Sequence, residues 1–178
     1  TGFIFSVMEQ NDTSIPLLIT NYHVLEKAVA GFVELHIAEN GLPSEKSVRV
    51  QFNESIINGN KLGNLDLIAI PLAGTLNNLK EKNIQIFYRT VDQNMVPKEE
   101  QIKYFAAIED ITFIGYPSGL YDNVNKLPII RQGITATPIW NQFNGENVFL
   151  IDAGVFPGSS GSPVFIYNHG SYPTKDGI

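Results

Sequence analysis

The stretch VFPGSSGSPVF, residues 155–165, places three serines among glycines and prolines. A serine hydroxyl is a weak nucleophile at its own pKa. It needs a base within hydrogen-bond reach, and the base needs a third group that fixes its tautomer. A cluster of Gly, Ser and Pro between apolar runs is by itself typical of a loop. The rest of the chain must therefore supply a histidine and a carboxylate before any of these serines becomes a candidate for catalysis.

His23 and Asp66 are the candidates for the base and its orienting carboxylate. His23 follows the apolar run LLIT in LLITNYHVLEKA, so we expect it at the end of a strand, where a side chain can face a cleft. Asp66 starts an apolar run in GNLDLIAIPL, and a charge there is either exposed at a turn or buried with a partner. The alternatives are a lone loop histidine and an ordinary turn aspartate. Asp152 in FLIDAG is a rival for the orienting role.

Two glycines give the serine-rich stretch a chemical meaning that a generic loop lacks. Gly158 and Gly161 flank a pair of serines. Glycine allows positive φ, which can turn backbone N–H groups inward, and two such groups beside a nucleophile make an oxyanion hole for acyl transfer. The hydrolase elbow Gly-x-Ser-x-Gly does not fit, because centring it on Ser160 puts Ser162 at the second glycine position.

Short runs rich in Val, Ile, Phe and Leu, separated by Asn, Gly, Asp and Pro, predict an all-β fold. In VELHIA the residues alternate in polarity, which puts His36 on the solvent side of a strand. We expect strands at Phe3–Met8, Pro16–Thr20, Phe32–Ala38, Ser47–Phe52, Leu65–Pro71, Ile84–Tyr88, Ile111–Gly115, Ile129–Ala136, Val148–Asp152 and Ser162–Tyr167.

Two stretches do not fit a strand pattern. Residues 76–82 are polar and suit a helical turn. Residues 97–110 suit a helix, because Pro97 is favoured at a first helical position and Ile102, Phe105 and Ile108 fall near one face. We expect the boundary between two lobes in the region of residues 76–100.

Composition excludes several classes of protein. Of the 178 residues 43% are hydrophobic and 17% charged, which is enough apolar material for a core, and the net charge of −6 makes nucleic acid an improbable partner. No cysteine is present, so there is no disulfide, thiol nucleophile or Cys-ligated metal, and the three histidines lack zinc-site spacing. We therefore expect no metal and no cofactor.

No apolar run is long enough to span a bilayer, and no signal peptide precedes TGFIFSV. We therefore expect a soluble protein. Its first residues already resemble a strand, so we expect the sequence to begin in the middle of a longer polypeptide. The compartment and the oligomeric state do not follow from the sequence.

Six motifs together resemble a trypsin-like serine peptidase of the chymotrypsin fold, nearest to the bacterial, cysteine-free branch that includes the HtrA/Deg proteases. LLITNYHVL resembles the histidine motif Thr-Asn-x-His-Val. LDLIAIPL resembles the aspartate motif Asp-x-Ala, with one residue more between Asp66 and Ala69. The most specific is IDAGVFPGSSGSPVF, which resembles Asp-Ala … Pro-Gly-x-Ser-Gly-x-Pro. The others are TGFIFSV, FIGYPSGL and RQGITATP, and the order His, Asp, Ser is that of the family.

The resemblance implies a serine endopeptidase with His23 as general base, Asp66 as its orienter and Ser160 as nucleophile. It implies an oxyanion hole formed by the N–H groups of Gly158 and Ser160, and a peptide or protein substrate. Ser159 then has only a turn role, and the acid that pairs with a new N-terminus in activated digestive members is absent. One wall of the specificity pocket would consist of Gly154, Val155, Phe156 and Pro157, which carry no charge. Asp152 is then structural, or supports the pocket floor.

The resemblance also implies a double β-barrel in a single domain, residues 1–178. Residues 1–75 would form the first barrel, 76–100 the connection and 101–178 the second barrel. Four strand candidates after residue 110 are too few to close a six-stranded barrel, so we expect the second barrel to be incomplete at the C-terminus. Two alternatives remain open: a catalytically inactive peptide-binding module on the same fold, and an esterase that uses the same triad.

Overall fold

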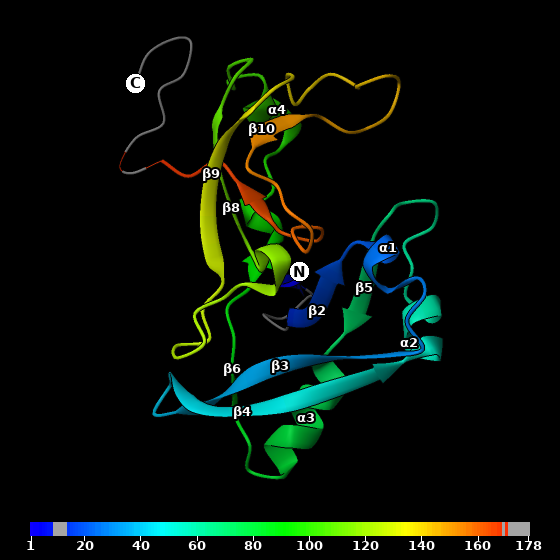
Figure 1. Ribbon diagram of the computed structural model, residues 1–178, viewed down its shortest axis with the longest axis vertical. Helices are drawn as coiled ribbons and strands as arrows, with labels where there is room; N and C mark the ends of the chain where they lie inside the picture. The colour runs from blue at the N-terminus through cyan, green and yellow to red at the C-terminus, as the bar shows by residue number, and fades with distance from the viewer. Residues whose placement is uncertain (9–13, 169, 171–178) are drawn as a thin grey trace. The chain divides into compact units, whose positions relative to one another are not determined.

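The computed structural model describes residues 1–8, 14–168 and 170. Within these residues, eleven strands form three sheets, and the helices are short (Figure 1). The predicted all-β fold is confirmed. The chain divides into two compact units, Thr1–Met95 and Val96–Ile178, which we describe in turn. The finer boundaries at residues 75 and 100, and the closure of each barrel, remain predictions.

The first unit contains two sheets. One has the strand order β5-β2-β1-β7 and the other has the order β4-β3-β6. The strands are β1 (Phe3–Met8), β2 (Ser14–Thr20), β3 (Ala30–Glu39), β4 (Leu42–Asn53), β5 (Ile68–Pro71), β6 (Ile86–Phe87) and β7 (Val91–Asp92). The helices are α1 (Tyr22–Leu25), α2 (Glu54–Gly59), α3 (Ala73–Glu81) and the 3₁₀ turn η1 (Gln93–Met95).

Apolar side chains from both sheets and from α2 form the core of the first unit. In β2 the burial alternates with the two-residue period of a strand, which places every second side chain in this core. The buried members are Ile4, Leu18, Leu35, Val50, Phe52, Ile57, Ile68, Ile70 and Leu72. The strands β3 and β4 pair over most of their length (Figure 1), and a bulge interrupts their register between His36 and Ala38.

The second unit contains one sheet of order β10-β9-β8-β11. Its strands are β8 (Asp110–Gly115), β9 (Ile129–Thr135), β10 (Ile151–Ala153) and β11 (Val164–Phe165). The short helices are α4 (Glu99–Ile102) and the 3₁₀ turn η2 (Pro117–Gly119). All pairings in this sheet are antiparallel, and β8 lies between β9 and β11. The buried apolar side chains described in this unit are Ile111, Phe113 and Pro117.

The helix predicted over residues 97–110 is wrong, because only Glu99–Ile102 is helical. The helix cannot continue because the following backbone is bonded elsewhere. The carboxylate of Glu109 accepts the N–H of Ala106, and the N–H of Glu109 donates to Thr135 Oγ1 at 2.8 Å. Residues 76–81 of the stretch predicted at 76–82 do lie in a helix, α3, which begins earlier than predicted, at Ala73, and ends at Glu81.

Other differences concern element ends and polar side chains. The strand predicted at Leu65–Pro71 starts only at Ile68, because Leu65 donates its N–H to Leu62 in a turn. Helix α2 was not predicted, although Asn53 caps it by accepting the N–H of Ile56. His36 is half-buried instead of simply facing solvent, and its Nδ1 donates to the carbonyl oxygen of Ser44 at 2.9 Å.

Candidate active site

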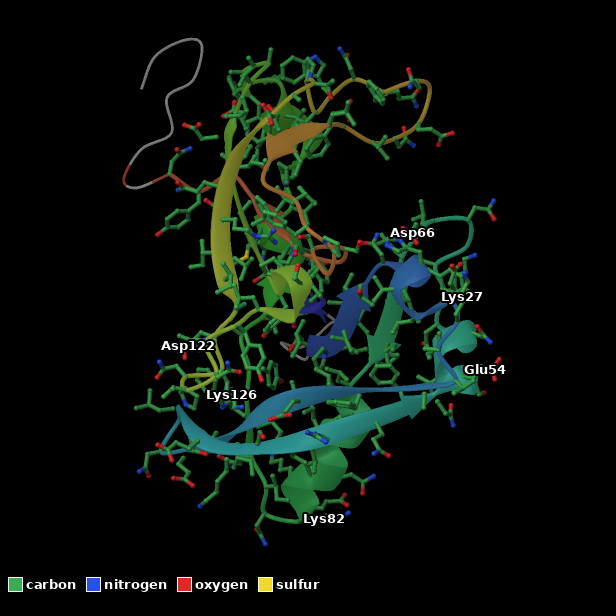
Figure 2. All side chains as sticks on the ribbon, in the orientation of Figure 1. Lys27, Glu54, Asp66, Lys82, Asp122 and Lys126 are labelled. Carbon is green, nitrogen blue, oxygen red and sulfur yellow. The ribbon has the colours of Figure 1, made fainter. Side chains whose placement is uncertain are left out.

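The register between β2 and β5 brings two distant segments of the first unit together. Thr20, the last residue of β2, lies opposite Ile68, the first residue of β5, in an antiparallel pair. The chain beyond Thr20 and the chain before Ile68 therefore leave the sheet at the same edge. The segment after Thr20 turns at Asn21 into α1, and Asp66 lies beside that turn (Figure 2).

His23 and Asp66 form a two-point contact at this edge. Asp66 Oδ2 lies 2.6 Å from His23 Nδ1, and Asp66 Oδ1 accepts the backbone N–H of His23 at 2.8 Å. Asn21 donates from Nδ2 to Oδ2 and to the carbonyl oxygen of Asp66, while Tyr22 donates its N–H to the same carbonyl oxygen. Both the side chain and the backbone of Asp66 are therefore fixed relative to the imidazole of His23. Each side chain of the pair is 52% exposed.

The environment of Asp66 favours its ionised form. Desolvation alone raises the pKa of Asp66, but the hydrogen bonds from the backbone and ring of His23, the charge of His23 and the bond from Asn21 outweigh it. The net result is a lowered pKa. Asp66 is thus a carboxylate that accepts from Nδ1–H of His23, which orients the ring and stabilises an imidazolium when one forms.

Ser160 lies in the second unit, on a turn that two positive-φ glycines shape. Gly158 has φ 88° and Gly161 has φ 82°. The N–H of Ser159 donates to the carbonyl oxygen of Phe156, and that of Ser162 donates to the carbonyl oxygen of Ser159, both at 3.0 Å. A Cβ at Gly158 would lie 2.7 Å from the carbonyl oxygen of Tyr116, so both the backbone angle and the space require glycine there.

The peptide that carries the Gly158 N–H is held by η2. The N–H of Ser118 donates to the carbonyl oxygen of Pro157. Because C=O and N–H point in opposite directions across a trans peptide, this bond directs the Gly158 N–H away from Ser118. Ser118 itself has φ 51°, an uncommon conformation outside glycine. Sequence analysis did not assign Ser118 this role, although the Pro-Ser-Gly turn signal was visible.

The residues predicted to form the pocket wall lie between β10 and the turn before Ser160. Gly154, Val155, Phe156 and Pro157 are all exposed. Asp152 is exposed on β10, opposite Ile134, so it belongs to the sheet of the second unit. No contact described in that unit makes it an orienting carboxylate.

One polar side chain that contacts residues 154–159 was not predicted from the sequence to have a role there. Arg131 on β9 donates from Nη1 to Gly154 and to Ser159. The only signal in the sequence is a cation within the predicted strand IIRQGIT.

Neither a metal cluster nor a spanning helix is found in the part of the chain that the structure describes. No group of three or more His, Asp or Glu side chains there could hold a metal ion. No described helix is long and apolar enough to cross a membrane. His169, one of the three histidines, lies outside the described residues.

Comparison with protein families defines the class of protein. The family model of the trypsin-like peptidase domain matches residues 1–171 of the 178. The chain therefore belongs to the trypsin-like peptidase domain family, whose substrates are peptides or proteins. No curated protein and no solved structure is similar enough to this chain to count as a match.

Proposed function

We propose that this protein is a serine endopeptidase that uses His23, Asp66 and Ser160 as its catalytic triad. The observation that carries the proposal is the two-point contact between His23 and Asp66, with 2.6 Å between Nδ1 and Oδ2. A carboxylate bonded to Nδ1 fixes the tautomer that leaves Nε2 to act as the base. A lone loop histidine and an ordinary turn aspartate would have no reason to share both a ring bond and a backbone bond.

The proposed reaction begins when His23 Nε2 takes the proton from Ser160 Oγ as the oxygen attacks the peptide carbonyl carbon. The tetrahedral intermediate collapses to an acyl-enzyme, and the imidazolium gives its proton to the leaving amine. Water, deprotonated by His23, then hydrolyses the ester and restores the serine hydroxyl. Asp66 stays ionised throughout, in agreement with its lowered pKa.

The proposed oxyanion hole consists of the N–H groups of Gly158 and Ser160. Two features support it: the positive φ of Gly158, and the bond from Ser118 to the carbonyl oxygen of Pro157, which points in the opposite direction from the Gly158 N–H. Donors that are already fixed stabilise the developing oxyanion without reorganising during the reaction.

The segment Gly154–Pro157 is the proposed wall of the specificity pocket. It carries no charged side chain, so we propose no preference for basic residues. We assign the protein to the bacterial, HtrA/Deg-like branch on the strength of its Thr-Asn-x-His-Val and Pro-Gly-x-Ser-Gly-x-Pro motifs and its lack of cysteine. The division into a His/Asp barrel and a serine barrel belongs to the same proposal.

Labelling with a fluorophosphonate probe tests the proposal. The probe phosphonylates a serine only when a base and an oxyanion hole activate it. We expect the wild-type protein to be labelled on Ser160, as identified by peptide mass spectrometry, and Ser160→Ala to lose the label. Substrate profiling with peptides and with esters would then separate an endopeptidase from an esterase.

Ser162→Ala is the matched control. It removes a neighbouring hydroxyl whose Oγ is buried with no hydrogen-bond partner among the described residues, so it should fold and be labelled as the wild type is. A folded wild-type protein that takes no label, or takes it on another serine, would overturn the proposal. The first of these results would instead indicate an inactive peptide-binding module.

A further inference from the structure

Arg131 joins two points of the segment that leads to Ser160. Its Nη1 donates to the carbonyl oxygen of Gly154 at 3.1 Å and to Ser159 Oγ at 2.9 Å. Ser159 Oγ also accepts the backbone N–H of Phe156 at 3.2 Å, and Ser159 is only 7% exposed. One guanidinium nitrogen therefore ties the start of the segment to the residue immediately before the proposed nucleophile.

The guanidinium of Arg131 also packs against a side chain of the neighbouring strand. Arg131 lies opposite Phe113 in the pairing of β9 with β8, and its Cζ is 4.3 Å from the centroid of the Phe113 ring. Phe113 is 2% exposed and belongs to the core of the second unit. The nucleophile segment is thus connected, through a single side chain, to a buried residue of the central strand β8.

An arginine at this position of the sheet destabilises the folded unit relative to an apolar side chain. Nε and Nη2 of Arg131 are buried and have no hydrogen-bond partner among the described residues. Buried donors without partners destabilise a fold, and a well-packed apolar side chain at such a site is often neutral or stabilising. Stability alone therefore favours a residue such as methionine at this position, and the two bonds of Nη1 must account for the arginine.

We propose that Arg131 is a positioning residue that holds residues 154–159 in the conformation in which Ser160 and the oxyanion donors can react. The inference rests on the proposed function, because it takes Ser160 as the nucleophile. Arg131 acts through Ser159, and this gives Ser159 a role that the pattern of the turn alone does not. A displacement of about 1 Å in a reacting group lowers rates by about 100-fold, so even a modest loosening of this segment has a measurable effect.

The test compares Arg131→Met with the wild-type protein. Methionine keeps an unbranched apolar stem over Phe113 but donates no hydrogen bond. We expect a melting temperature equal to or above that of the wild type, and a fall of about 10- to 100-fold in the maximal rate of labelling by the fluorophosphonate, with little change in the probe's half-saturation concentration. Arg131→Lys keeps one cationic donor and should restore part of the rate.

The matched control is Arg49→Met. Arg49 also lies over an aromatic ring, with Cζ 4.7 Å from the centroid of Phe32, and it also has a polar contact, to Glu34. Its described contacts are with Phe32 and Glu34 and not with His23, Asp66 or residues 154–160, so the same chemical change should leave the labelling rate unaltered. Ser159→Ala should lower the rate as Arg131→Met does, and the double variant should lose less than the product of the two effects.

Amide hydrogen exchange gives a readout that does not need activity. Loss of the Arg131 bond should speed exchange at the Phe156 and Ser159 amides, while β8 amides stay protected. Unchanged exchange in Arg131→Met overturns the inference, and so does a labelling rate that falls only in proportion to a lowered melting temperature. If the wild-type protein takes no label, the proposed function fails and with it the catalytic consequence, while the exchange data still decide whether Arg131 fixes the segment.

Discussion

Asp66 accepts hydrogen bonds from two different groups of His23, and an asparagine can replace only one of them. In Asp66→Asn, the amide oxygen can still accept the backbone N–H of His23, but the amide nitrogen then faces Nδ1 as a donor. The ring proton must move to Nε2, which can no longer take the proton of Ser160. We expect the labelling rate to fall by about 1,000- to 10,000-fold in a folded protein, measured with the fluorophosphonate. A rate within tenfold of the wild type would exclude Asp66 as the orienting group.

The same substitution should change how stability depends on pH. Because its pKa is lowered in the folded state, the carboxylate of Asp66 stabilises the protein at pH values above its unfolded pKa of about 3.9, and this stabilisation disappears as the pH falls through the folded pKa. The pair is half exposed, so its contribution is at most about 1 kcal/mol. We expect the difference in unfolding free energy between wild type and Asp66→Asn to shrink as the pH falls below about 5 and to vanish in stronger acid. A difference that persists in strong acid would contradict this assignment.

Single residues also show what the sequence could and could not supply. His23, Asp66 and Ser160 could be singled out because each lies in a short motif whose residue types suit its chemistry. The contacts of Arg131 and Ser118 could not, because they join segments distant in sequence. The pairing of β9 with β10, which leads into the serine-bearing segment, and the turn at η2 bring these residues together, and neither register nor turn geometry can be read from a local pattern.

At the scale of elements, the contact between β9 and β10 depends on a glycine. Gly133 lies opposite Ala153, and a Cβ at Gly133 would lie 2.5 Å from both Ala153 Cβ and the carbonyl oxygen of Asp152. The backbone of β10 cannot yield without leaving the sheet. We expect Gly133→Ala to lower the unfolding free energy by about 1–3 kcal/mol, measured by urea denaturation, and to slow labelling because β10 leads into the segment before Ser160.

Gly74 provides the control for that experiment. It lies within α3, and a Cβ there would meet nothing within 4 Å. Because alanine is the better helix former, Gly74→Ala should stabilise the protein by up to about 1 kcal/mol and leave labelling unchanged. Equal effects of the two substitutions would mean that the close approach of β10 to β9 does not control stability.

The elements differ in how well a local pattern predicts them. The strand Phe3–Met8 was predicted with its observed bounds, because a continuous apolar run pairs on both sides, with β2 and with β7. The helix predicted over residues 97–110 was wrong, because the bonds of Glu109 to Ala106 and Thr135 override the helical spacing of its apolar residues. Polar contacts, from a local turn at Leu65 as well as from Glu109 to the distant Thr135, thus decided the cases in which the apolar pattern alone was misleading.

At the scale of the whole molecule, buried apolar side chains are unevenly distributed over the described residues. The first unit has a core of nine, whereas those described as buried in the second unit are Ile111, Phe113 and Pro117. Both units expose large apolar side chains, and in the second unit these include Val155 and Phe156 beside the proposed nucleophile. Since burial of apolar surface is the main source of stability, the unit that carries Ser160 should open more readily than the unit that carries His23.

Native-state hydrogen exchange can measure this difference directly. We expect the slowest amides to lie in β1, β2 and β5, and the amides of β9 and β10 to exchange at least about 10-fold faster, which corresponds to about 1.4 kcal/mol less opening free energy. If the amides of both units were equally protected from exchange, the number of buried apolar side chains in each unit would not determine its stability. A less stable second unit would make the maximal labelling rate more sensitive to mild urea than the exchange protection of the amides in β1, β2 and β5. It would also explain why the serine-bearing segment needs the side-chain bond from Arg131 in addition to its backbone bonds.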